Sequence, residues 1–183
     1  FPAGIYQPLS EDFEVSVMDS PAGRCREIKR QEELDAIACT QRACERAMRQ
    51  AVLLIGSSTP RGDMLYRDGQ PLTSEEVRGA IEVSLLEDGC EAMDTIVAGG
   101  LAGADPHARG TGPIASNAPI VIDIFPRSKS SRYFADMTRT VLRGEASPEV
   151  KEIYEAVRLA QDRGLQAIRA GVSGREVHSQ VSQ

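Results

Sequence analysis

Two apolar segments separated by a polar connector constrain the fold of this chain most strongly. The apolar segments are residues 120–125 and 133–142, and the connector is 127–132. This pattern predicts a β-hairpin with a loop of medium length. Each arm carries a single carboxylate, Asp123 in the first and Asp136 in the second. Because a carboxylate in a buried strand is costly unless it is paired or binds a metal, both acids are candidate functional residues.

The register of the hairpin decides how close the two carboxylates lie. If Phe125 lies opposite Phe134, Asp123 lies opposite Asp136, and directly opposed residues have Cβ atoms about 4.5–5.5 Å apart on one face. Two like charges at that separation must share a proton, meet an arginine or bind cations between them. A slip of one residue would place them on opposite faces. The alternative is that one Asp is a strand-edge or turn residue and the other forms a salt bridge with Arg139 or Arg132.

The composition narrows the classes of partner. The chain has 183 residues, which suggests one domain or a domain with an appendage. Its 21 basic and 27 acidic side chains give a formal charge of -6, which lends no support to nucleic-acid or anionic-membrane binding. No apolar run approaches the roughly 20 residues of a membrane span. We therefore expect no nucleic-acid partner and no membrane partner.

The cysteines and the first residues bear on the compartment. None of the four cysteines forms a C-x-x-C pair, so free thiols in a reducing cytosol are expected rather than a structural zinc site. No basic region followed by an apolar one opens the chain, so no secretory signal is expected. The first residue is Phe1 rather than Met, which indicates a processed chain or a piece of a longer one. A cytoplasmic location follows as an expectation.

Two helices are expected in the first half of the chain. Residues 1–24 are rich in Pro, Gly and Ser and predict a linker or the tail of a preceding N-terminal domain. Apolar residues recur at helical spacing from about residue 29 to 55, which predicts a long, half-buried helix. Residues 56–72 are punctuated by Gly and Pro and predict a loop. The second helix is expected to begin at Thr73, whose side chain would form a capping box with Glu76.

The second half combines a strand, a glycine-rich loop, the hairpin and two more helices. Residues 92–98 predict a strand that runs into a glycine-rich loop at 99–112. This loop contains His107, just ahead of the hairpin, although a lone His in a loop is more often a surface residue than a catalytic one. Ser147, followed by a proline, is expected to start an amphipathic helix, and Ser173 a last one. Long helices beside an antiparallel hairpin predict an α+β fold.

Four short segments resemble one known family. They are, in chain order, residues 93–100 (MDTIVAGG), 105–107 (DPH), 120–126 (IVIDIFP) and 135–140 (ADMTRT). This combination resembles the pita-bread metallopeptidases, which include Xaa-Pro aminopeptidases, prolidases, methionine aminopeptidases and creatinase. The sequence of the third segment is most similar to the proline-peptidase branch. The resemblance covers residues 26–183.

The resemblance implies a fold and a set of site residues. It implies that residues 25–183 form the N-terminal half of a pita-bread catalytic domain, with an antiparallel sheet covered by long helices, preceded by the 1–24 segment. In the family, two Asp, one His and two Glu hold two divalent metal ions. The two Asp correspond to Asp123 and Asp136. The family His that hydrogen-bonds substrate and stabilises the tetrahedral intermediate corresponds to His107.

The remaining family ligands have no counterpart in this chain. The metal-binding His and both Glu of the family lie beyond the position of Gln183, and His178 does not match the family's pattern. With two of five ligands present, we expect metal binding to be weak. The 183-residue chain is therefore expected to be inactive by itself, as a truncated catalytic domain.

The resemblance implies a metal-dependent exopeptidase as the parent protein. The expected activity is that of an Xaa-Pro aminopeptidase or Xaa-Pro dipeptidase, in which a hydroxide bound by two metal ions attacks the peptide bond before proline. Mn²⁺ is favoured, with Co²⁺ or Zn²⁺ as alternatives. The expected partners are a peptide substrate with proline in the second position and a second copy of the chain in a homodimer. The alternatives are a non-catalytic pita-bread module that binds peptides or proteins, and creatinase-like chemistry without metal.

Overall fold

The computed structural model describes residues 3–15 and 21–182, and the chain divides into two compact units, Phe1–Ala36 and Ile37–Gln183. The first unit contains helices α1 (Ala3–Asp12) and α2 (Pro21–Glu27). Neither helix is predicted from the sequence. The assignment of residues 1–24 to a linker or to the tail of a preceding domain stays a prediction. The domain boundary at residue 25 also stays a prediction.

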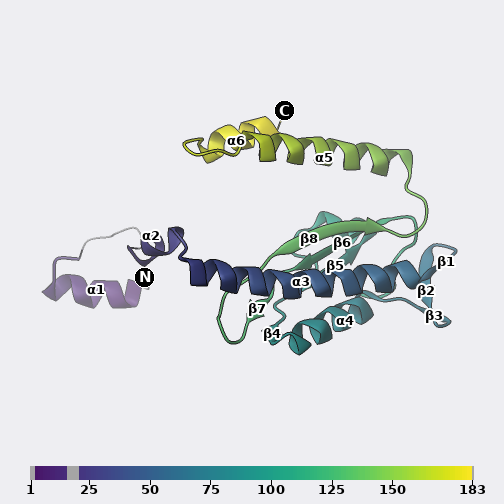
Figure 1. Cartoon of the computed structure of the whole chain (residues 1–183), viewed down its shortest axis with the longest axis horizontal. Coiled ribbons are helices and arrows are strands. Elements are labelled where there is room, and N and C mark those ends of the chain that lie inside the picture. Colours follow the sequence, from purple (N-terminus) through teal and green to yellow (C-terminus); the bar gives the residue numbers. More distant parts are fainter. Residues whose placement is uncertain (1–2, 16–20, 183) are drawn as a thin grey trace. The chain divides into compact units, whose positions relative to one another are not determined.

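The two helices predicted in the first half of the chain are present. Helix α3 (Gln31–Ser57) spans the two units, and α4 (Ser74–Glu87) belongs to the second (Figure 1). The Thr73 side chain accepts a hydrogen bond from the backbone N–H of Glu76 at 3.2 Å, as the capping box requires. The Glu76 carboxylate instead accepts a hydrogen bond from Arg67 at 2.7 Å. Glu76 is therefore committed to the arginine on a neighbouring strand.

The segment predicted as a loop at 56–72 forms a small sheet, so that prediction is wrong. Strands β1 (Thr59–Arg61), β2 (Met64–Arg67) and β3 (Gln70–Pro71) pair antiparallel in the order β1-β2-β3. The turn between β1 and β2 contains Gly62 at φ 58°, a left-handed conformation that glycine adopts at little cost. The strands are too short to show the alternation of polar and apolar residues that marks a strand in a sequence.

The central sheet has three antiparallel strands in the order β5-β6-β8. They are β5 (Ile96–Gly99), β6 (Pro119–Ile124) and β8 (Met137–Leu142), so the expected hairpin and the strand before it are both present. A second, two-stranded sheet joins β4 (Cys90–Glu91) to β7 (Arg127–Ser128), which lies in the expected connector of the hairpin.

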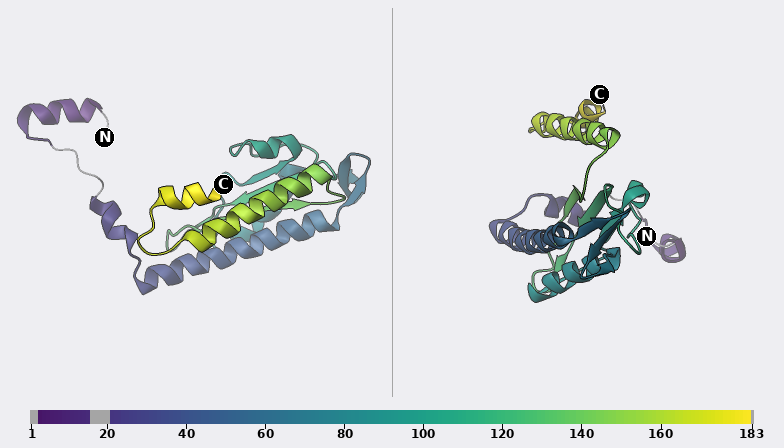
Figure 2. Two further views of the ribbon diagram at one scale, coloured as in Figure 1. Left: turned by 90° about the horizontal axis from the view of Figure 1, so that it is seen from above. Right: turned by 90° about the vertical axis from the view of Figure 1, so that its right-hand side faces the viewer.

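One face of the central sheet forms the core with α3 and α4. Residues 120, 122 and 124 of β6 are isoleucines with 0% exposure, and they belong to one hydrophobic cluster with the buried residues of both helices. Figure 2 shows the two helices on the same side of the sheet. The residues between the isoleucines, Val121 and Asp123, are only partly buried because side chains alternate across a strand.

The register of the hairpin differs from the predicted one by two residues. Asp123 lies opposite Thr138, not opposite Asp136. Phe134 does not lie opposite Phe125 but forms an isolated bridge with Arg127 in the same shifted register. Part of the connector pairs with β4. A shift of two residues keeps every side chain on its predicted face.

Two further helices follow the hairpin. Helix α5 (Pro148–Ala167) begins at the N-cap Ser147, and α6 (Gly174–Val181) begins at the N-cap Ser173, both as predicted. The short 3₁₀-helix η1 (Gly100–Ala104) follows β5. Among residues 3–15 and 21–182, no helix is both long and apolar enough to cross a bilayer.

Candidate functional site

Asp123 stands on the face of the central sheet that turns away from α3 and α4. Its carboxylate Oδ1 accepts a hydrogen bond of 2.5 Å from the hydroxyl of Thr138, its cross-strand neighbour on β8. The two residues line a cavity of about 270 Å³ whose opposite wall is residues 103–106. The sheet thus presents a carboxylate oxygen to an open cavity that is also lined by the segment preceding His107.

Asp136 lies directly before β8 and shares the electrostatic environment of Asp123. Partial burial raises the pKa of the Asp136 carboxyl, and the negative charge of Asp123 raises it further. In the observed register, a strand continued by one residue would place Asp136 opposite Phe125, diagonal to Asp123 and on the same face. The predicted direct opposition of the two acids is wrong, and their proximity on one face stays a prediction, now in a diagonal arrangement.

The thiol of Cys44 on α3 lies on the core side of the sheet, and its pKa is affected by burial and by the charges of Asp136 and Asp123. Burial raises the pKa of Cys44 to about 12, and Asp136 and Asp123 are among the negative charges that contribute. Its Sγ donates to the backbone oxygen of Ile124 at 3.3 Å. All four cysteines are free, as predicted, with Cys44 and Cys90 buried and the other two exposed.

His107 lies at the exposed end of the loop that walls the cavity. Its side chain is 95% exposed, and its ring Nδ1 is 4.0 Å from the Oδ1 of Asp105. The same Asp105 oxygen accepts a hydrogen bond of 2.8 Å from the backbone N–H of His107, which tightens the turn. Pro106 lines the cavity, and His107, which follows it directly in the chain, does not.

The chemistry of Asp123 and Asp136 fits a divalent cation. Burial first, and then the negative charge of Asp123, raises the pKa of the Asp136 carboxyl, and a cation between the two carboxylates would relieve their repulsion. Oxygen ligands of this kind suit hard or borderline cations such as Mn²⁺. Within the described ranges, no group of three or more His, Cys, Asp and Glu side chains is placed to hold a metal ion. His178 is on α6, where its ring contacts Ser182.

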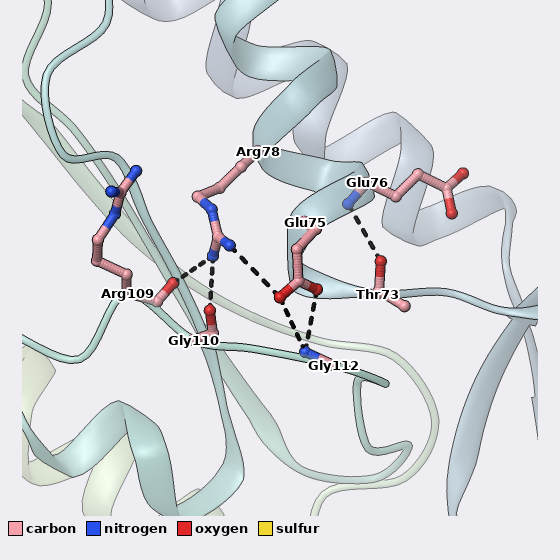
Figure 3. Close-up of polar contacts among 7 residues, drawn as sticks. All are labelled: Thr73, Glu75, Glu76, Arg78, Arg109, Gly110 and Gly112. Atoms are coloured by element: carbon pink, nitrogen blue, oxygen red, sulfur yellow. Dashed lines mark hydrogen bonds and ion pairs between the residues drawn. The ribbon is translucent and has the colours of Figure 1, made fainter.

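Two features of the site are absent from the sequence predictions. The first is Thr138, which orients Asp123; its only signal is its place in the matching segment 135–140. The second is a pair of α4 side chains, Glu75 and Arg78, that bind the end of the His107 loop (Figure 3). Nothing in the spacing of these two residues indicates that they contact a loop more than thirty positions later.

Comparison with known proteins gives consistent matches. Residues 35–183 match the model of metallopeptidase family M24. An Xaa-Pro dipeptidase from Pyrococcus furiosus is 30% identical over 177 residues, which cover 95% of this chain and 47% of the dipeptidase. The solved prolidase from the same organism has a TM-score of 0.81 at 24% identity, covering 99% of this chain and 51% of the prolidase. The solved dipeptidase PepE from Mycobacterium ulcerans also has a TM-score of 0.81, at 26% identity, covering 99% and 46%.

The family match covers most of the chain and defines its class: the chain belongs to metallopeptidase family M24. Its fold is that of the prolidase and dipeptidase structures, so the predicted α+β pita-bread architecture is confirmed. The chain spans about half the length of the curated relatives it matches. Members of this family use divalent metal ions, which agrees with the donor chemistry of the two Asp side chains.

Proposed function

We propose that this chain supplies part of the active site of a metal-dependent exopeptidase that cleaves the peptide bond before proline. The observation that carries the proposal is the pair of same-face carboxylates, Asp123 and Asp136, beside a cavity walled by the loop that leads to His107. The relatives named Xaa-Pro dipeptidase support the substrate class. An Xaa-Pro dipeptidase and an Xaa-Pro aminopeptidase both fit this site.

Each residue of the proposed site has a distinct task. Asp123 and Asp136 would hold two divalent ions, with Mn²⁺ favoured over Co²⁺ and Zn²⁺ because the ligands are oxygens. The ions would polarise the scissile carbonyl and lower the pKa of bound water. Thr138 donates to Asp123 Oδ1 and so orients that carboxylate. His107 would donate a hydrogen bond to the negative charge that develops on the carbonyl oxygen of the substrate.

The exposure of His107 is compatible with that task. A substrate seated over the cavity would cover the loop that ends at Pro106 and meet the imidazole at its rim. Donors that meet the substrate only as charge develops accelerate the chemical step more than they tighten substrate binding. Loss of the imidazole should therefore lower kcat more than it raises KM.

We expect the 183-residue chain by itself to be inactive. Within residues 3–15 and 21–182, Asp123 and Asp136 have no third metal ligand beside them. Metal affinity depends on the number of ligands, so the two acids alone should bind a cation weakly. The homodimer and the cytoplasmic location belong to this proposal, and sedimentation of the purified protein tests the first of them.

Hydrolysis of an Xaa-Pro dipeptide in the presence and absence of Mn²⁺ tests the proposal. The protein expressed from its complete reading frame should release proline only with metal, and Asp123→Asn should abolish the reaction. The 183-residue chain should release none under the same conditions. Binding of the peptide without cleavage by the complete protein would instead establish the non-catalytic module.

A further inference from the structure

The loop that carries His107 is hydrogen-bonded to strand β5 of the central sheet at a position after the histidine. The backbone N–H of Val97 on β5 donates a hydrogen bond of 3.0 Å to the carbonyl oxygen of Arg109. Gly110 is buried, at φ 75°, and a Cβ on it would lie 1.8 Å from the Val97 oxygen. The loop therefore lies against the edge of β5 at a distance that only glycine allows. His107 is two residues before this contact.

Two side chains of α4 also form hydrogen bonds with the same stretch of loop (Figure 3). The Nη1 of Arg78 donates hydrogen bonds of 2.6 Å to the Arg109 oxygen and 2.7 Å to the Gly110 oxygen. The carboxylate of Glu75 accepts from the backbone N–H of Gly112, at 3.0 and 3.2 Å for its two oxygens. One guanidinium thus donates hydrogen bonds to two successive carbonyl oxygens, those of Arg109 and Gly110, and one carboxylate accepts from the amide of Gly112.

The geometry favours a dedicated contact over a chance surface pairing. Glu75 and Arg78 are one turn apart on α4 and form an ion pair of 3.6 Å, so each holds the other in place. The side chain of Arg78 is only 13% exposed, although arginine is usually exposed. Glu76, between them in sequence, turns to Arg67 and makes no loop contact in the described part of the chain.

We propose that Glu75 and Arg78 are positioning residues that hold the 109–112 segment on β5 and thereby place His107 at the rim of the Asp123 cavity. The role in catalysis depends on the function proposed above, whereas the clamp on the loop does not. Both side chains contact the loop backbone and each other. They act on the loop backbone at residues 109–112, directly after the segment that carries His107.

Hydrogen exchange at single amides tests the clamp on the 183-residue chain. In Arg78→Met, the Val97 amide should exchange at least about tenfold faster, because a hydrogen bond to a charged group is lost at each of two loop carbonyls. The conservative Arg78→Lys should restore part of the protection. The matched control is Arg67→Met, whose guanidinium bonds Glu76 instead of the loop. Unchanged exchange at Val97 would overturn the proposal, as would equal acceleration throughout β6 and β8.

A second pair of variants covers the case in which Arg78→Met does not fold. Glu75→Ala removes the acceptor for the Gly112 amide, and Glu76→Ala removes an equal charge from the same helix turn without touching the loop. The Gly112 amide should exchange about tenfold faster in the first variant and be unchanged in the second. Equal exchange in both variants would contradict the role of Glu75.

The peptidase assay tests the consequence for catalysis. In the protein expressed from its complete reading frame, Glu75→Ala should lower kcat for an Xaa-Pro dipeptide about tenfold with KM nearly unchanged, since one misplaced donor acts mainly in the transition state. Glu76→Ala should change kcat by less than about twofold. Equal kcat in the two variants would overturn the catalytic part. If the unmodified protein cleaves nothing, the proposed function fails, and the exchange data still decide the clamp.

Discussion

The two faces of the β5-β6-β8 sheet differ in what covers them. On the core face, the isoleucines at 120, 122 and 124 are fully buried beneath α3 and α4. On the other face, Asp123 and Thr138 line an open cavity, and a larger cavity of about 580 Å³ separates the far end of β8 from α5. The alternation along β6 therefore sorts its residues into those that stabilise the fold and those that are free to bind a ligand.

The long helices that flank the two faces show the same contrast. Both α3 and α5 are amphipathic in sequence. The apolar side of α3 is buried, and Ile55 is 3% exposed. The apolar side of α5 is exposed: Ile153 is 64% exposed and Val157 63%. Helical periodicity shows which side of a helix is apolar, but it does not show what packs against that side.

Matched truncations on the two helices should give the largest difference. Ile55→Ala should lower the free energy of unfolding by about 2–5 kcal/mol because it leaves a cavity in the core. Ile153→Ala should change it by less than about 0.5 kcal/mol, since that side chain already faces solvent. Urea unfolding followed by circular dichroism measures both. Similar losses in the two variants would mean that α5 is packed in solution, and the contrast between the faces would then fail.

Gly110→Ala should damage the site side and spare the core. A Cβ at this left-handed position would collide with the backbone of β5, so we expect the loop to detach at a cost of about 1–3 kcal/mol. The backbone amides of β6 should keep their protection from hydrogen exchange, while that of Val97 should lose it. Gly112→Ala is the matched control, because it is also left-handed but has open space for a Cβ. Equal effects of the two changes would show that strain, and not contact with β5, decides the outcome.

The buried thiol of Cys44 should make the core face sensitive to alkaline pH. Because burial raises the pKa of Cys44 from 9.0 to about 12, the folded state keeps its proton where the unfolded state loses it. This stabilisation is complete below pH 9 and is lost as the pH rises toward 12. Between pH 8 and pH 10 the free energy of unfolding should fall by about 1 kcal/mol from this group.

The comparison of Cys44→Ala with the unmodified chain isolates that contribution. The variant should lose less stability between the two pH values, whatever its stability at pH 8. Cys39→Ala, which removes an exposed thiol from the same helix, should follow the unmodified chain. An identical pH dependence in all three proteins would rule out a protonated, buried Cys44.

A buried threonine should give the smallest effect, and a favourable one. The hydroxyl of Thr95 is buried without a hydrogen-bond partner among the described residues. Thr95→Val should therefore raise the free energy of unfolding by up to about 1 kcal/mol. The equally buried Thr40 donates to the Tyr133 backbone oxygen at 3.4 Å, so Thr40→Val should lower it by about 1 kcal/mol. Thermal unfolding of the two variants gives the sign of each change.

Local signals in the sequence predicted the helices and the hairpin well. The caps at Thr73, Ser147 and Ser173 all form, because a capping residue acts on amides only a few positions away. Periodicity placed α3, α4 and α5 correctly within a few residues. The resemblance to the family was carried by short segments around β5, β6 and β8, and the comparisons confirm it.

Contacts between residues far apart in the chain could not be predicted from the sequence. The predicted hairpin register was wrong by two residues. The pairing of β7 with β4, between segments that lie far apart in the chain, was not predicted. The sheet of β1, β2 and β3 was missed because its strands are too short to show a pattern. The hydrogen bond from Arg78 to the carbonyl oxygen of Arg109, in the His107 loop, joins residues 31 positions apart. Such contacts depend on the tertiary fold, which no local pattern encodes.

Paramagnetic broadening of backbone amide signals by Mn²⁺ tests most directly whether Asp123 and Asp136 form part of a metal site. In the 183-residue chain, substoichiometric Mn²⁺ should broaden first the amides at residues 123, 136 and 138, because the proposed binding position of the ion is between the two carboxylates. Asp123→Asn and Asp136→Asn should each remove this effect, while Asp63→Asn, on the exposed turn after β1, should leave it unchanged. Broadening centred on other acidic residues, or unaltered by the two substitutions, would contradict the assignment of the site.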